Sequence, residues 1–128
     1  MKKKAIWLID DDPIYKIVMK KIITKLGLLD STTTFSNGKE ALLALELVIQ
    51  NQNNIPDLIL LDIEMPIMDG WEFMNEIQKL ERDCLKNTTI YICSSSIASE
   101  DKDVAQQNCM ISGYMSKPIK IEDLSLII

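Results

Sequence analysis

Residues 58–62 read LILLD, four aliphatic residues that stop at an aspartate. The run is too short for a typical helix, and aliphatic side chains at every position are typical of a strand buried on both faces. Both faces of a sheet are covered in this way when helices connect parallel strands. The stretch therefore predicts a central strand of a parallel sheet, with Asp62 at its carboxyl end.

The rest of the chain repeats this arrangement, because short apolar runs alternate with longer segments of helical periodicity. The predicted strands are residues 5–9, 32–35, 58–61, 89–93 and 113–115, and the predicted helices are residues 13–26, 41–49, 71–80, 100–108 and 121–128. Five rounds of strand and helix with short links predict a single doubly wound α/β domain over residues 1–128. The last predicted helix has room for only two turns. We therefore expect that it is either truncated or completed by another part of a larger assembly.

Two of the predicted helices carry apolar stripes that we expect to face the sheet. In the first helix, apolar residues recur every four positions, and Gly27 is expected to end it. The stripe of the first helix is Ile14, Val18, Ile22 and Leu26, and that of the second is Ala41, Leu42, Leu45, Val48 and Ile49.

Composition and charge exclude several classes of protein. With a net charge of −5 and a pI of about 4.7, the chain is a poor candidate for binding nucleic acid phosphates. No apolar run is long enough to span a membrane, and the run before the first aspartates is too short for a secretory signal. Three widely spaced cysteines and no histidine leave no zinc site, so we expect reduced thiols, with Cys93 in the core. We expect a cytoplasmic protein.

Polar residues stand where the apolar strands end. Asp10 and Asp11 follow the first strand, Asp62 the third, Ser94 the fourth and Lys117 the fifth. In open parallel sheets, ligands bind outside the carboxyl ends of the strands, which lie along one edge. If the first and third strands are neighbours, the aspartates face each other, and the hydroxyl and the ammonium reach the same place.

Such a group of carboxylates needs a cation. Two carboxylates about 4 Å apart repel by roughly 4 kcal/mol at an effective dielectric constant near 20. Oxygen ligands without histidine or a suitable cysteine select a hard ion, and Mg²⁺ suits a site with few carboxylates and room for water and phosphate. A lysine and a hydroxyl suit the other oxygens of a phosphoryl group. The set points to phosphoryl transfer onto an aspartate.

Four motifs, in this order, resemble the receiver domain of bacterial two-component response regulators. They are LIDDDP (residues 8–13), LILLDIEMPIMDG (58–70), YICSSS (91–96) and GYMSKP (113–118). The resemblance covers nearly the whole chain and implies a flavodoxin-like fold, with five parallel strands in the order 2-1-3-4-5 and helices on both faces.

The resemblance also implies roles for the residues at the strand ends. Asp62 would accept the phosphoryl group, Asp11 would bind Mg²⁺ directly, and Asp10 would bind it mostly through water. The backbone carbonyl of Glu64 would complete the protein ligands, and the acidic side chain of Glu64 would affect phosphate loss in a direction that the sequence does not fix. Lys117 would pair with the phosphoryl group. The peptide bond between Lys117 and Pro118 is expected to be cis, which would set the direction of the lysine.

Two further roles follow from the resemblance. Two serines could contact the phosphate. Ser94 is the first residue beyond the predicted strand, whereas the family's usual spacing, counted back from Lys117, indicates Ser95. We choose Ser94. Tyr114 resembles the aromatic switch residue, so that phosphorylation would change the face formed by the fourth helix, fifth strand and last helix.

The partners follow from the same resemblance. The phosphate donor would be a phosphohistidine on a sensor histidine kinase or a histidine phosphotransfer protein. The donor must be another molecule, because this chain contains no histidine. An output protein or a missing C-terminal output domain would receive the signal, and the chain itself would be a signalling domain rather than a turnover enzyme.

Asp12 has a simpler interpretation as the N-cap of the first helix, because Pro13 suits the first helical position. Two rival functions remain. A phosphatase resembling the haloacid dehalogenase family would use Asp10 and Asp12 instead of Asp62, but only eleven residues follow Lys117, which leaves little room for the later acidic motif of those enzymes. A binding module would keep the fold without being phosphorylated.

Overall fold

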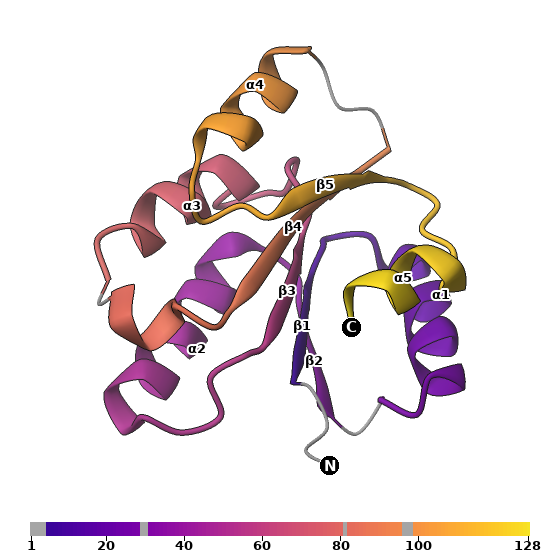
Figure 1. Cartoon of the computed structure of the whole chain (residues 1–128), viewed down its shortest axis with the longest axis horizontal. Coiled ribbons are helices and arrows are strands. Elements are labelled where there is room, and N and C mark those ends of the chain that lie inside the picture. The colour runs from indigo at the N-terminus through magenta and orange to yellow at the C-terminus, as the bar shows by residue number, and fades with distance from the viewer. Residues whose placement is uncertain (1–4, 29–30, 81, 96–98) are drawn as a thin grey trace.

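The computed structural model describes residues 5–28, 31–80, 82–95 and 99–128. Within these ranges, five parallel strands form one sheet in the predicted order β2-β1-β3-β4-β5 (Figure 1). The strands are β1 (Ile6–Ile9), β2 (Thr32–Phe35), β3 (Leu58–Leu61), β4 (Thr89–Ser94) and β5 (Gly113–Ser116). The helices are α1 (Pro13–Lys25), α2 (Gly38–Asn51), α3 (Gly70–Ile77), α4 (Ser99–Gln107) and α5 (Ile121–Ile127).

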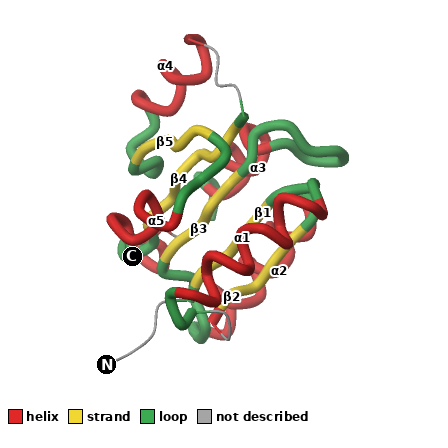
Figure 2. The backbone as a smooth tube through the Cα atoms, turned by 90° about the vertical axis from the view of Figure 1, so that its right-hand side faces the viewer, coloured by secondary structure: helices red, strands yellow, loops and turns green. Residues whose placement is uncertain are grey.

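The helices cover both faces of the sheet, as predicted. α1 and α5 lie on one face, and α2, α3 and α4 lie on the other (Figures 1 and 2). Each face has its own apolar core, the larger one under α2 and α3 and the smaller one under α1 and α5. Among the described residues, no helix has both the length and the apolar character needed to cross a membrane.

The stretch at residues 58–61 is the central strand. β3 pairs with β1 on one side and β4 on the other, and all four of its residues are buried. Aliphatic side chains on both faces of β3 therefore contribute to both cores. Cys93 on β4 is also buried, as expected, and the three cysteines are free thiols.

The predicted stripe of α1 is wrong. Ile14 is 72% exposed and Val18 is 45% exposed, whereas the buried residues of the helix are Met19 and Ile23. A helix turns by about 100° per residue, so positions four apart drift by about 40° at each step. A stripe with a strict spacing of four therefore winds around the helix, and only its later part, including Ile22, packs against the core.

The other helices agree better with the prediction. In α2, Ala41, Leu42 and Leu45 are buried, and the rest of the predicted stripe packs beside them. α3 begins one residue earlier and ends three residues earlier than the predicted range. A capping box between Asp69 and Glu72 sets its start. A short 3-10 turn at Arg82–Leu85, which the sequence analysis did not predict, precedes β4.

The start of α3 lies against the backbone of Asp62. The Gly70 N–H donates to the Ile63 carbonyl at 2.8 Å, and a Cβ atom on Gly70 would lie 2.4 Å from the Asp62 carbonyl oxygen. No side chain fits in that space. Gly70 therefore lets the loop after β3 close directly behind Asp62.

Candidate functional site

The carboxyl ends of the strands enclose a cleft with a volume of about 800 Å³. Every acid, hydroxyl and ammonium that the sequence places at the strand ends lines it. The lining residues are Asp10, Asp11, Asp12, Pro13, Asp62, Glu64, Met65, Ser94, Ser95 and Lys117.

Backbone hydrogen bonds hold the site residues just beyond the strands. The Asp10 N–H donates to the Phe35 carbonyl on β2 at 3.0 Å, and the Asp62 N–H donates to the Ile9 carbonyl on β1 at 2.9 Å. The Lys117 N–H donates to the Ser94 carbonyl at 2.9 Å. The sheet ladder thus continues one step past its edge and aligns the site residues with each other.

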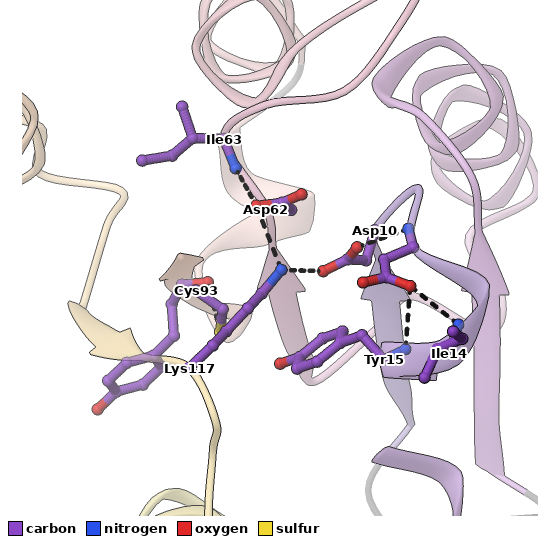
Figure 3. Close-up of polar contacts among 9 residues, drawn as sticks. Asp10, Ile14, Tyr15, Asp62, Ile63, Cys93 and Lys117 are labelled. Atoms are coloured by element: carbon purple, nitrogen blue, oxygen red, sulfur yellow. Dashed lines mark hydrogen bonds and ion pairs between the residues drawn. The ribbon is translucent and has the colours of Figure 1, made fainter. Parts of the chain in front are cut away.

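The Lys117 ammonium lies between two carboxylates. Its Nζ is 2.5 Å from Asp10 Oδ2 and 3.5 Å from Asp62 Oδ1 (Figure 3). Although burial lowers the pKa of Lys117, the hydrogen bonds and charges of the two aspartates raise it above its ordinary value overall. The lysine is therefore charged at neutral pH and partly offsets the repulsion between the aspartates.

Asp62 is a buried carboxylate in an acidic environment. Burial, and then the charge of Asp10, raise the pKa of Asp62 from 3.8 to about 6, although Lys117 and the Ile63 N–H oppose this change. The Ile63 N–H donates to Asp62 Oδ1 at 2.9 Å, which orients the carboxylate. At neutral pH most of Asp62 is ionised, as a nucleophile or a metal ligand must be.

Asp10, Asp11 and Asp62 fit a hard divalent cation. One carboxylate oxygen from each lies within 4.8 Å of the others. Asp10 and Asp62 are buried and fixed, whereas Asp11 is exposed at the mouth of the cleft. Glu64 also lines the cleft, with an exposed side chain. An all-oxygen donor set with one open side suits Mg²⁺, which keeps several waters.

The two candidate serines differ in position. Ser94 is the last residue of β4, is buried and pairs with Ser116 of β5, directly before Lys117. Ser95 also lines the cleft but is exposed. The expected cis bond between Lys117 and Pro118 is present.

Asp12 is the N-cap of α1, as predicted. Its Oδ1 accepts hydrogen bonds from the Ile14 N–H at 2.9 Å and the Tyr15 N–H at 3.3 Å. Because this carboxylate is directed at the helix backbone, it takes no part in the acidic group formed by Asp10, Asp11 and Asp62.

Tyr114 lies on β5 away from the cleft and is 37% exposed. The Lys102 ammonium from α4 lies 5.4 Å from the centre of the Tyr114 ring, within range of a cation–π interaction. A second contact links α4 to α3, because the Trp71 indole N–H donates to Asp101 at 3.0 Å.

Sequence reasoning missed Tyr15. Its ring lies beside Lys117, with 4.1 Å between Nζ and the ring centre. Burial raises the pKa of the Tyr15 hydroxyl, and the nearby Cys93, Asp10 and Asp62 raise it further, so the ring stays neutral. One feature of the sequence could have indicated this contact. Tyr15 lies in the first turn of the helix that directly follows the acidic run, and so close in the chain to Asp10 and Asp11.

The pKa of Asp62 gives a prediction about stability. Because the pKa is raised on folding, ionised Asp62 destabilises the folded state, fully above about pH 6 and not at all below pH 3.8. Allowing for partial solvent screening, we expect Asp62→Asn to stabilise the metal-free protein by about 1 kcal/mol at pH 7.5. Urea unfolding with EDTA should show this gain, and it should disappear near pH 4.

Asp103→Asn, at an exposed position on α4, serves as the control and should change stability by no more than a few tenths of a kcal/mol. A loss of stability in Asp62→Asn at pH 7.5 would mean that the ion pair with Lys117 outweighs the cost of burial.

Comparisons with known proteins agree with this geometry. The response regulator receiver domain family matches residues 6–128. A Helicobacter pylori protein named sensor histidine kinase CheAY is 34% identical over 122 residues, which cover 94% of this chain and 14% of that protein. The whole-protein activity of this longer relative does not transfer to the chain.

Solved structures give the same fold. A two-component response regulator from Cytophaga hutchinsonii has a TM-score of 0.88 at 24% identity, covering 98% of this chain and 95% of that one. A response regulator receiver protein from Dyadobacter fermentans has a TM-score of 0.81 at 28% identity, covering 95% and 92%. Together with the family match over residues 6–128, these findings mean that the chain belongs to the response regulator receiver domain family of two-component signalling systems.

Proposed function

We propose that Asp62 accepts a phosphoryl group from a phosphohistidine of a partner protein and that the whole of residues 1–128 acts as one receiver domain. The Asp62 carboxylate attacks phosphorus, the P–O bond forms, and the P–N bond to the donor imidazole breaks. The observation that carries this proposal is the meeting of Asp62, Lys117, Ser94 and the acidic pair in one cleft.

Asp10, Asp11, Asp62 and the backbone carbonyl of Glu64 would hold Mg²⁺. When bound, this ion supplies positive charge to the phosphoryl oxygens during transfer. The carboxylates of Asp10 and Asp11 follow β1 and that of Asp62 follows β3, and one oxygen from each lies within 4.8 Å of the others.

Lys117 and Ser94 would hold the other phosphoryl oxygens. The ammonium already lies 3.5 Å from Asp62 Oδ1, so a phosphoryl group on this carboxylate comes within its reach. Ser94 lies on the adjacent strand and is tied to Lys117 through the backbone. The sheet thus brings both donors next to Asp62, where small movements of their side chains would let them stabilise the developing anion.

Phosphorylation would be read out through α4, β5 and α5. In this structure Tyr114 is half-exposed and contacts Lys102, and α4 is tied to Trp71 through Asp101. Movement of Ser94 toward the phosphoryl group would allow the Tyr114 side chain to move inward. This change would alter the relative populations of two arrangements of α4. Of the loop between Ser94 and α4, residues 96–98 lie outside the described part of the chain.

The partners are a sensor histidine kinase or a histidine phosphotransfer protein, and then an output protein or a C-terminal output domain. The lack of histidine in the chain supports an external donor, and the net charge of −5 argues against direct binding to nucleic acid. We assign the domain to the cytoplasm and to signalling, with slow loss of its own phosphate, rather than to metabolic turnover.

The first test is the site of labelling. Acetyl phosphate and Mg²⁺ should add one phosphoryl group, and mass spectrometry of a tryptic digest should place it on residues 40–79, which contain Asp62. Asp62→Asn should abolish the label. Label on residues 5–16, which contain Asp10, would favour the phosphatase, and failure to bind either Mg²⁺ or beryllofluoride would favour a binding module.

The second test separates Asp11 from Asp12. Asp11→Ala should abolish Mg²⁺-dependent phosphorylation without loss of stability, because Asp11 is an exposed ligand. Asp12→Ala should keep phosphorylation and lower the free energy of unfolding by about 1 kcal/mol, because it removes the cap of α1. Labelling kinetics and urea unfolding measure the two effects. Equal loss of phosphorylation in both variants would contradict this division.

The third test separates the two serines. Ser94→Ala should slow phosphorylation of Asp62 by about 100-fold, the usual effect of removing one donor to a developing anion. Ser95→Ala, the matched control at the next position, should leave the rate within about twofold. The opposite result, measured with acetyl phosphate under the same conditions, would assign the contact to Ser95.

A further inference from the structure

Among the described residues, the Lys117 ammonium lies beside two carboxylates and the face of an aromatic ring. Asp10 and Asp62 lie on one side, and the ring of Tyr15 lies 4.1 Å away on another (Figure 3). This distance is well inside the range of about 6 Å over which an aromatic face attracts a cation. The lysine side chain is 15% exposed, so water screens the attraction only in part.

Phosphoryl transfer requires Lys117 to change partners. In this structure its closest partner is Asp10, whereas after transfer it must pair with oxygens attached to Asp62. The side chain is flexible, with a compact charge on a four-carbon stem. An aromatic face attracts the ammonium whichever anion it is paired with, so contact with Tyr15 can persist throughout the exchange.

Tyr15 is itself well fixed. Its backbone N–H donates to the cap residue Asp12 at 3.3 Å in the first turn of α1. Its ring packs against the core under α1 and α5. The contact surface for Lys117 is therefore set before any ligand arrives.

The hydroxyl group of Tyr15 does not account for the position of this residue beside Lys117. The oxygen is buried, and the described residues offer it no hydrogen-bond partner. A buried hydroxyl in this condition is a cost to stability rather than a gain. The face of the ring is thus the part that acts on Lys117.

We propose that Tyr15 is a positioning residue for phosphoryl transfer, whose ring face keeps the Lys117 ammonium at the site while the lysine moves from Asp10 to the phosphoryl oxygens. This inference rests on the proposed function of Asp62. It separates the ring, which guides the lysine, from the hydroxyl, which is dispensable.

The test combines two variants of Tyr15 with one of Lys117. With acetyl phosphate and Mg²⁺, Tyr15→Phe should keep the rate of phosphorylation within twofold of the unaltered protein. Tyr15→Leu should lower it by about fivefold to thirtyfold, the range expected for loss of a partly buried cation–π contact. In a Lys117→Met background, Tyr15→Leu should cause no further loss.

Nuclear magnetic resonance gives a readout that does not depend on the reaction. The Lys117 side-chain protons near the ring should be shifted upfield in the unaltered protein and in Tyr15→Phe, and not in Tyr15→Leu. The shift should persist when beryllofluoride and Mg²⁺ are bound. Loss of the shift in that state would overturn the proposal, because the lysine would then leave the ring.

The kinetic outcomes are equally decisive. Equal rate losses from Tyr15→Leu with and without Lys117 would mean that the ring only packs, and a loss in Tyr15→Phe like that in Tyr15→Leu would assign the effect to the hydroxyl. If the unaltered protein is labelled at Asp62 and Tyr15→Leu matches its rate, the inference about Tyr15 alone fails. If the unaltered protein takes no label at Asp62, the proposed function itself fails.

Discussion

The carboxylates of Asp10 and Asp62 repel each other at an edge of the sheet where both are almost fully buried. Their proximity follows from the strand order, because β1 and β3 are neighbours in register, with Ile9 opposite Leu61, and an aspartate directly follows each strand. The cost is visible in the raised pKa of Asp62. In the described part of the chain, the Lys117 ammonium bridges the two acids, and its positive charge offsets part of their repulsion.

Sequence reasoning predicted the strands best. Runs such as that of β3 are buried on both faces, so hydrophobicity alone defines them, and the residues just after them must lie along one edge. The site could be predicted for the same reason: Asp10, Asp62 and Lys117 are fixed by strand ends, not by side-chain packing.

The errors have physical causes of a different kind. The stripe of α1 was misjudged because spacing alone does not say which side of a helix meets the sheet, and a spacing of four drifts around it. The contact of Tyr15 with Lys117, and that of Trp71 with Asp101, join segments far apart in the chain. Such contacts depend on how helices pack onto the sheet, which no local pattern contains. The choice between Ser94 and Ser95 turned on one residue of register at a strand end, where patterns are weakest.

The loop behind Asp62 has a consequence for how this domain can vary. The Gly70 N–H is bonded to the Ile63 carbonyl, so the residues between them form a closed ring whose two ends meet beside Asp62. A ring closed in this way has a fixed circumference. Insertion or deletion of one residue would have to break the closure, whereas side chains that point outward from it, such as that of Ile67, which is 79% exposed, can be exchanged. We therefore expect homologous domains to keep the length of this loop and to vary mainly at outward-pointing positions such as that of Ile67.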